Sequence, residues 1–179
     1  MLDIPTLETE RLLLRPWRPE EDAAAVYAYA SIEEVARYML FVQHTSIADA
    51  EAFLEYTKTS PEHGYAVTLR DGGQLIGGCG ITPVPAHSKG EFGYVLHPDY
   101  WGRGLGTEIA KRLIRYGFED LGLNRICARA DTRNPASTRV MIKAGMTPEG
   151  TLREDMIVKG TARSFVLCSI LRSEWAFEV

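Results

Sequence analysis

The residues of this sequence best suited to chemistry are three glycines at alternate positions, in the segment Trp101-Gly102-Arg103-Gly104-Leu105-Gly106-Thr107. Glycine lacks a Cβ atom, so its backbone can adopt positive φ angles and lie close to a ligand. A helical pattern follows the segment, and the free N–H groups and dipole of a helix's first turn attract anions. Arg103 adds a cation and Thr107 a hydroxyl donor. The segment therefore predicts a phosphate or pyrophosphate site, with a tight turn that binds nothing as the alternative.

The glycine spacing separates this site from the commoner nucleotide sites. It is Gly-x-Gly-x-Gly, whereas dinucleotide folds use Gly-x-Gly-x-x-Gly, and the chain has no Gly-x-x-x-x-Gly-Lys-Ser/Thr segment. A nucleotide-binding domain built on the same glycines is therefore the least favoured of three hypotheses for the function.

The elements that must position this segment mix strands and helices. A meander of strands over about 65–69, 74–81 and 91–97 leads into it, and a helix over about 107–121 follows, because apolar residues there recur at helical spacing. Further strands are expected over 7–15, 125–130, 147–152 and 164–171, and further helices from 19 and over 32–38, 47–57 and 135–145. This order predicts one α/β (α+β) domain over residues 1–179, built around one mixed sheet.

Composition excludes several classes of partner. The chain has 179 residues, a net charge of −4 and a pI near 5.6, which gives no overall attraction to nucleic acid or anionic membranes. Its three cysteines are far apart, which indicates a reducing compartment rather than a disulfide framework or a zinc site. No apolar stretch approaches the roughly 20 residues of a membrane helix, and the N-terminus does not read as a signal peptide. We therefore expect a cytoplasmic protein, monomeric or homodimeric, with no metal, membrane or nucleic-acid partner.

The stretch around the glycines, from Glu91 to Glu108, resembles the acetyl-CoA motif of the GNAT acetyltransferase superfamily. The similarity continues in order through 118–125, 134–137 and 143–146. Residues 7–16 resemble the first strand of the branch that acetylates the N-termini of ribosomal proteins (RimJ/RimL-like). The resemblance covers nearly the whole chain. It implies the acyl-CoA N-acyltransferase fold, with a mixed, mainly antiparallel central sheet, splayed fourth and fifth strands and flanking helices, and it implies acetyl-CoA as the cofactor.

The resemblance also implies which residues hold that cofactor. In the superfamily the pantetheine arm lies in the gap between the splayed strands, which here assigns it to the backbone of Tyr94, Val95 and Leu96. Contacts with the pyrophosphate and the remainder of the cofactor are implied for Gly102, Arg103, Gly104, Leu105, Gly106, Thr107, Asn134, Ser137 and Lys143.

Three positions depart from the superfamily's pattern. Trp101 stands where many members have a glutamine or arginine that binds phosphate. Met141 stands where many have a tyrosine as general acid, and Met156 where the branch has its proposed glutamate base. Neither methionine can transfer a proton. The branch's other acid is the serine of Asn-x-x-Ser, which is Ser137 here, and a helix-capping role is the alternative for this serine.

Several residues are candidates for the acceptor side of the site. Glu91 lies on the strand that contacts the cofactor, Glu154 is close to the Met156 position, and His97 ends the Glu91 strand, so each is a candidate general base. A structural or charge-balancing role is the alternative for each. Tyr38 and Phe41 belong to the helical region that walls the acceptor groove in this superfamily, and are candidates for substrate binding.

The expected function is transfer of the acetyl group of acetyl-CoA to a primary amine, either a protein N-terminal α-amine or the amine of a small molecule. An α-amino group, with a pKa of roughly 7.7–8.0, is partly neutral at pH 7, whereas a lysine near 10.4 is not. A weakly basic amine therefore demands less of the enzyme. Because Met141 and Met156 replace proton-transfer residues, a module that binds acyl-CoA without turnover is the alternative hypothesis.

Overall fold

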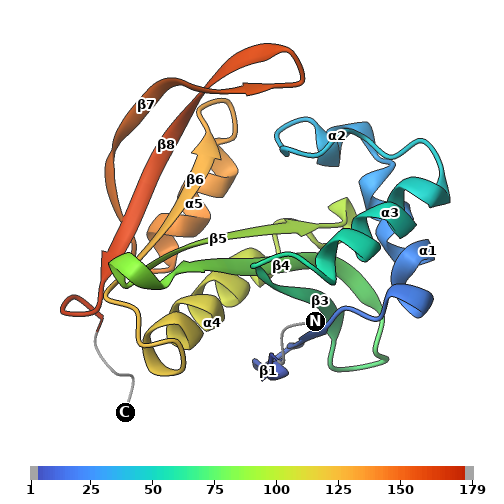
Figure 1. Ribbon diagram of the computed structural model, residues 1–179, viewed down its shortest axis with the longest axis horizontal. Helices are drawn as coiled ribbons and strands as arrows, with labels where there is room; N and C mark the ends of the chain where they lie inside the picture. Colours follow the sequence, from blue (N-terminus) through green and yellow to red (C-terminus); the bar gives the residue numbers. More distant parts are fainter. Residues whose placement is uncertain (1–3, 176–179) are drawn as a thin grey trace.

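A single sheet of eight strands organises the computed structural model, which describes residues 4–175 (Figure 1). The strand order is β1-β2-β3-β4-β5-β6-β8-β7, and neighbours are antiparallel except β5 with β6. The predicted mixed, mainly antiparallel architecture is therefore confirmed, while residues 1–3 and 176–179 of the predicted domain lie outside the described residues. The strands are β1 (Leu7–Glu8), β2 (Leu12–Pro16), β3 (His63–Leu69), β4 (Leu75–Val84), β5 (Lys89–Leu96), β6 (Arg125–Asp131), β7 (Thr147–Val158) and β8 (Thr161–Leu171).

Helices cover both faces of the sheet and bury two apolar cores. On one face α4 packs its wide apolar stripe, including Ile109 and Leu113, against the strands, and α5 adds Met141. On the other face α1, α2 and α3 enclose a second core around Trp17 and Leu54. No helix within residues 4–175 is long and apolar enough to cross a bilayer. The helices are α1 (Pro19–Ala30), α2 (Glu33–Ala36), α3 (Ile47–Thr57), α4 (Leu105–Glu119) and α5 (Pro135–Lys143).

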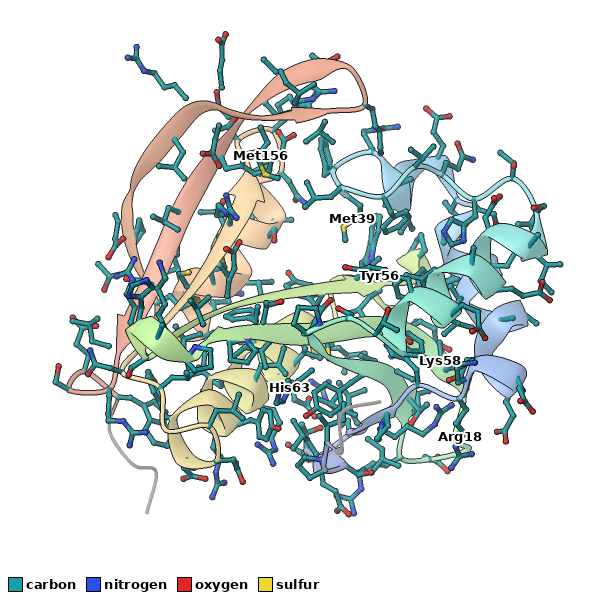
Figure 2. The ribbon with its side chains drawn as sticks, viewed as in Figure 1. Arg18, Met39, Tyr56, Lys58, His63 and Met156 are labelled. Atoms are coloured by element: carbon teal, nitrogen blue, oxygen red, sulfur yellow. The ribbon has the colours of Figure 1, made fainter. Side chains whose placement is uncertain are left out.

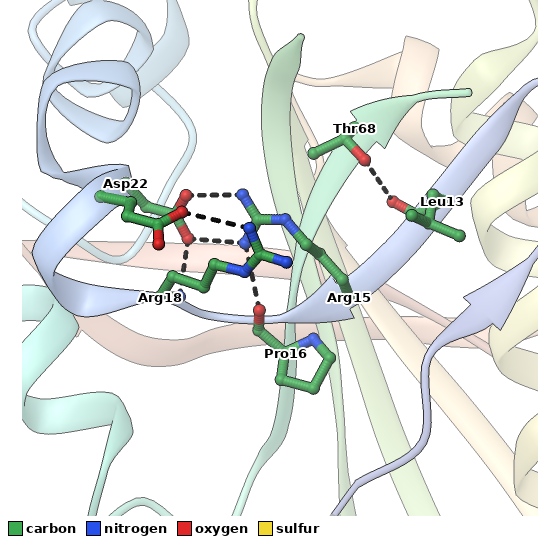
Figure 3. Close-up of polar contacts among 7 residues, drawn as sticks. Leu13, Arg15, Pro16, Arg18, Asp22 and Thr68 are labelled. Atoms are coloured by element: carbon green, nitrogen blue, oxygen red, sulfur yellow. Dashed lines mark hydrogen bonds and ion pairs between the residues drawn. The ribbon is translucent and has the colours of Figure 1, made fainter. Parts of the chain in front are cut away.

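A buried ion pair fixes α1 against β2. Arg15 donates to both carboxylate oxygens of Asp22, at 2.8 and 2.6 Å, and the Arg18 N–H donates to the same carboxylate (Figure 3). Asp22 is only 3% exposed, and a buried carboxylate is tolerated when such bonds satisfy it. The pair holds α1 where Trp17, just before the helix, lies over β3 and β4.

The predicted strand over 7–15 is two strands. β1 and β2 pair with Leu7 opposite Leu14, the Thr9 N–H donates to the Leu12 carbonyl oxygen, and the Thr9 hydroxyl accepts from the Leu12 N–H. Threonine side chains can offer the backbone such local bonds in place of extended structure. The turn that results places Arg11 outside the strands, beside α4.

The closing pair of strands is longer than predicted. β7 and β8 extend through the expected loop as a two-stranded arm (Figure 1), with a bulge between Leu152 and Met156 where Glu154 has a φ of 50°. Lys159 and Gly160, with φ of 51° and 75°, make the turn at its tip. Residues expected to form a loop are thus held by strand pairing.

β5 and β6 separate soon after they meet. They pair only at Lys89–Arg125, Gly90–Ile126 and Glu91–Cys127. Beyond these pairs β5 follows β4 to Leu96 and β6 follows β8 to Asp131, so a gap widens between them. The splayed strands implied by the resemblance are therefore present.

Candidate active site

The edge of β5 that faces the gap carries backbone groups without a strand partner. Backbone hydrogen-bonding groups alternate in direction along a strand, and the His97 N–H donates to the Ile76 carbonyl oxygen on β4 at 2.8 Å. By this alternation the backbone of Val95 also faces β4, whereas the backbones of Tyr94 and Leu96 face the gap. Two of the three residues expected to pair with pantetheine are thus placed for it. Val95 is not placed to do so through its backbone.

Trp101, at the position of an expected phosphate donor, uses its indole N–H within the protein. Its Nε1 donates to the Leu96 carbonyl oxygen at 2.8 Å. This bond ties the residue before the glycines to the end of β5. The glycine turn therefore begins at the wide end of the gap.

The glycine turn is open and is followed at once by a helix. Gly102 and Gly104 have φ of 72° and 80°, and a Cβ atom on Gly104 would find its nearest neighbour 3.6 Å away, while one on Gly102 would find none within 4 Å. Because Gly104 is the N-cap, α4 starts at Leu105, two residues earlier than predicted. The N–H groups of Leu105, Gly106 and Thr107 thus belong to the first turn, which suits an anion such as pyrophosphate.

Leu105 and Gly106 can contribute to such a site only through their backbone. The Leu105 side chain is 4% exposed and lies in the core. A Cβ atom on Gly106 would lie 3.1 Å from the Tyr94 ring, so a larger residue there would require that ring to shift by a few tenths of an ångström. The third glycine of the motif therefore has a structural cause separate from ligand binding.

Arg11, which the sequence did not single out, holds the glycine turn. Its Nη1 donates to the Arg103 carbonyl oxygen at 2.9 Å and its Nε donates to Glu108 at 2.7 Å, while Thr9 donates to Glu108 at 2.6 Å. Burial alone would raise the pKa of Glu108, but these bonds outweigh it and lower the pKa. Glu108 therefore remains charged, and Arg11 offsets a negative charge that would otherwise oppose a phosphate in the first turn of α4.

The other residues expected to bind the cofactor's phosphates lie at the surface. The Arg103 guanidinium is 5.3 Å from the Tyr100 ring centroid, and Lys143 is exposed in the last turn of α5. Thr107 is half-buried in the first turn of α4.

Ser137 lies beside the gap with its hydroxyl outside the helix cap. Asn134 caps α5 by accepting from the Ser137 backbone N–H at 3.2 Å. The Ser137 hydroxyl hydrogen-bonds to the Tyr94 side chain; burial raises the pKa of Tyr94, and this bond offsets part of the rise. Met141, at the position of the superfamily's tyrosine, is 1% exposed in the core. Of these two positions, only Ser137 presents a proton donor next to β5.

Glu91 is held in a network with Arg129. The guanidinium donates to both Glu91 oxygens at 2.8 and 3.0 Å and to Asp155 at 2.8 Å, and its Nη1 lies 3.9 Å from Met156 Sδ. The Glu91 hydrogen bonds are the main cause that raises the pKa of Arg129. The strand position predicted for Glu91 is observed, and a cation already pairs with its carboxylate.

The two other candidate bases lie away from the gap or are used locally. Glu154 is exposed at the β7 bulge, where its N–H donates to the Ser164 hydroxyl at 3.0 Å. His97 accepts from the Asp99 N–H at 3.3 Å and caps a short turn. The geometry of both residues fits a structural role.

The arm and the α2 region meet across the space over β5. Lys159, at the tip of the arm, donates to the Ala36 carbonyl oxygen at the end of α2 at 2.6 Å. Arg133, before α5, lies 5.5 Å from the Tyr38 ring centroid. The predicted acceptor residue Tyr38 is thus part of a contact between the segment after α2 and the segment before α5. We call the space over β5 that these two contacts span the cleft.

One methionine lies on each side of this space. Figure 2 shows Met39 beneath α2 and Met156 on the side of the arm. Phe41, the second predicted acceptor residue, packs on the α1–α3 core with its ring 5.7 Å from that of His44. Phe41 therefore packs behind the α2 region and is not placed to contact an acceptor directly. No group of three or more metal-binding side chains occurs within residues 4–175.

Comparisons with known proteins agree with this geometry. Residues 11–147 match the model of the acetyltransferase (GNAT) domain. The uncharacterized N-acetyltransferase YoaA of Bacillus subtilis is 35% identical over 173 residues, which cover 94% of this chain and 97% of that protein. The spermidine N(1)-acetyltransferase of Escherichia coli K12 is 29% identical over 92 residues, about half of each chain (51% and 50%). A crystal structure of a GNAT-family acetyltransferase from Bacillus anthracis superposes with a TM-score of 0.85 at 27% identity, covering 94% of this chain and 99% of that one.

Proposed function

From the fact that this chain belongs to the GNAT acetyltransferase family, whose domain is an acetyl-CoA-dependent acyltransferase, we propose that it transfers acetyl directly from acetyl-CoA to a primary amine in a ternary complex. The observation that carries the proposal is the separation of β5 from β6 beside an open glycine turn at the start of α4. A gap with unpaired backbone and a turn that suits pyrophosphate are the two features that an extended CoA molecule requires.

The residues along this path fit the parts of CoA. Gly102, Gly104 and the first-turn N–H groups of α4 suit the pyrophosphate. The gap-facing backbones of Tyr94 and Leu96 suit the amide groups of pantetheine. Asn134 and Lys143 would line the cofactor from α5. Because the Leu96 carbonyl oxygen already accepts from Trp101, the Leu96 N–H and both Tyr94 groups are the donors and acceptor left for the ligand.

The chemistry follows from groups beside that gap. A neutral amine attacks the thioester carbonyl carbon, a C–N bond forms, the C–S bond breaks, and the sulfur takes a proton. Backbone donors aimed at the carbonyl oxygen stabilise its developing charge, which is often the largest catalytic contribution. Ser137 is the proposed acid for the sulfur, because its hydroxyl lies next to Tyr94 and is not used in the cap.

The proposed acceptor is a primary amine that reaches the cleft between α2 and the arm. A protein N-terminal α-amine and a small polyamine are the two classes we retain. The first follows from the resemblance to the ribosomal-protein branch, and the second is supported by the relative named for spermidine. Either would approach between Tyr38 and the β5 floor.

An acetyl-CoA thiol-release assay tests this function. The purified chain is given acetyl-CoA with N-terminal peptides, polyamines and single amino acids, and free thiol is measured against a reaction without acceptor. We expect acceptor-dependent release and an acetylated product of the matching mass. Tight acetyl-CoA binding with no release across the panel would instead identify a binding module.

A further inference from the structure

The floor of the acceptor cleft is made of glycines, and one carboxylate lies on it. Gly64 of β3 pairs with Gly80 of β4, which pairs in turn with Gly93 of β5. On the cleft face Trp17 covers Gly64, at 3.2 Å from a Cβ atom built there. Glu62 covers Gly80, since a Cβ atom there would lie 2.8 Å from the Glu62 carboxyl carbon. A Cβ atom on Gly93 would meet nothing within 4 Å, so the floor is open from Glu62 to the β5 edge.

This placement brings the Glu62 carboxyl close to the reacting end of the site. Paired residues on neighbouring strands lie about 5 Å apart, so Gly93 is one strand from the carboxyl and directly precedes Tyr94. The Tyr94 backbone faces the gap in which the thioester is proposed to lie. Gly93, the one sheet position between Gly80 and that edge, has no side chain of its own and no other atom within 4 Å of where a Cβ would lie.

The loop between α3 and β3 fixes this position. The Glu62 N–H donates to the Ser60 hydroxyl at 3.1 Å, and Ser60 is itself 9% exposed. Gly80 provides the seat, because any larger residue would displace the carboxyl. The side chain is therefore held over the sheet from both ends.

The Glu62 carboxyl has no partner to neutralise it. Within residues 4–175 no hydrogen bond or ion pair is formed by its oxygens. The residue as a whole is exposed along the cleft, but its carboxyl lies against the sheet, and this desolvation raises its pKa. A desolvated carboxylate without a partner is stabilised by a nearby cation or by taking up a proton. An ammonium group can provide either.

The groups that face Glu62 do not alter this conclusion. The Tyr29 hydroxyl of α1 lies near Gly78 on the same face of β4. The Cys79 thiol is influenced by the charge of Glu62 but packs in the core on the other face of the sheet. Burial raises the pKa of both groups, so both are neutral at physiological pH. The remaining neighbour, Trp17, carries no charge.

The carboxylates that the sequence suggested are either paired with a cation or open to solvent. Glu91 and Asp155 share Arg129, and Glu154 is exposed at the bulge on the arm. Glu62 therefore differs from each of the candidates that the sequence suggested.

We propose that Glu62 is the general base of the reaction and takes a proton from the ammonium form of the acceptor, directly or through one water. This inference rests on the proposed acetyltransferase function. The acceptor R–NH₃⁺ gives one proton to the carboxylate and becomes the neutral nucleophile. As the C–N bond forms, the nitrogen loses a second proton, and the sulfur released by C–S cleavage gains one. Glu62 then returns its proton to solvent before the next turnover.

The pH dependence of turnover in Glu62 variants tests this role. Glu62→Gln keeps the shape of the side chain but removes the base. Glu62→Asp keeps the carboxylate on a side chain that is shorter by one methylene. Glu51→Gln, on the exposed side of α3, is the matched control. For each protein kcat/KM is measured from pH 5 to 10 with the best acceptor of the thiol-release assay, together with CoA affinity by calorimetry and the thermal midpoint.

We expect Glu62→Gln to lower kcat/KM by about 10²–10⁴-fold near neutral pH, the usual contribution of a general base. The loss should shrink as the pH passes the acceptor's own pKa, because the amine then arrives neutral. The acidic inflection of the wild-type profile should disappear, and Glu62→Asp should restore part of the rate. CoA affinity should not change, and the thermal midpoint should not fall, because Glu62→Gln removes a desolvated charge that has no partner.

Three results would overturn the inference. An active wild type whose profile is unchanged in Glu62→Gln would exclude Glu62 while leaving the acetyltransferase function intact. An equal loss at every pH, accompanied by weaker CoA binding, would show a structural residue. A wild type that releases no thiol with any amine would overturn the proposed function itself, and this role with it.

Discussion

Arg129 donates to both carboxylate oxygens of Glu91, at 2.8 and 3.0 Å, across strands that pair for only three residues. The two side chains are 30% and 39% exposed, so the pair contributes modestly to stability, about 0.5–1 kcal/mol. The pair lies at the point where β5 and β6 separate, so it joins the two strands at the narrow end of the gap.

The first prediction follows from this pair. Glu91→Gln should leave kcat within a few-fold of wild type but lower the free energy of unfolding, because its carboxylate serves Arg129. A double-mutant cycle with Arg129→Met, measured by urea denaturation, should give a coupling energy of about 0.5–1 kcal/mol. A hundredfold loss of kcat in Glu91→Gln with unchanged stability would instead make Glu91 the base.

The second prediction concerns the glycine turn. Gly104→Val should abolish CoA binding in calorimetry, because the side chain would occupy the open side of the turn and the φ of 80° disfavours a β-branched residue. Gly73→Val is the control, since Gly73 has a φ of 66° and open surroundings in the β3–β4 turn. It should carry a similar backbone strain and bind CoA normally. A folded Gly104→Val with undiminished affinity would rule out this turn as the pyrophosphate site.

The third prediction concerns the proton donor. Ser137→Ala should lower kcat by about 100-fold or more, the lower end of general acid catalysis, with CoA affinity preserved. Ser137→Thr retains a hydroxyl and should recover part of the rate, and Thr138→Ala removes the neighbouring hydroxyl as a control. If Ser137→Ala changes only CoA affinity in calorimetry, Ser137 is a binding residue and the acid lies elsewhere.

The fourth prediction concerns the bridge over the cleft. Lys159→Met removes the donor to the Ala36 carbonyl oxygen, a bond of about 1 kcal/mol. Hydrogen exchange should then quicken in α2 and at the tip of the arm, and the KM for the acceptor should rise while CoA affinity stays constant. Lys58→Met, which breaks a surface pair with Glu55 on α3, should do neither. Unchanged exchange in Lys159→Met would show that the walls are held independently of this contact.

The cofactor half of the site could be predicted from the sequence because it is local. The strand over 91–97, the glycines and the following helix lie within about 30 consecutive residues, and each carries its own signal in spacing or residue type. The differences are small and local too: Gly104 in a left-handed conformation starts α4 two residues early, and Thr9 folds the expected first strand into a hairpin.

The acceptor half could not be predicted because it is assembled from distant segments. Nothing in the sequence distinguishes Arg129 from the other arginine of its strand, Arg125, and its partner Glu91 is 38 residues away along the chain. Lys159 and Ala36 are 123 residues apart. Glu62 follows a helix like many surface glutamates, and only the path of the loop between α3 and β3 places its carboxyl on Gly80.

The early separation of β5 and β6 has a consequence for how this protein behaves between turnovers. Two strands end their pairing in the middle of a sheet, so without CoA the fold contains an internal pair of edge strands. Unpaired edges are where foreign strands add and chains aggregate. CoA in the gap would act as a removable strand, and we expect the protein to be most prone to self-association when the cofactor is scarce. The supply of a metabolite would then govern the colloidal stability of the chain as well as its rate of turnover.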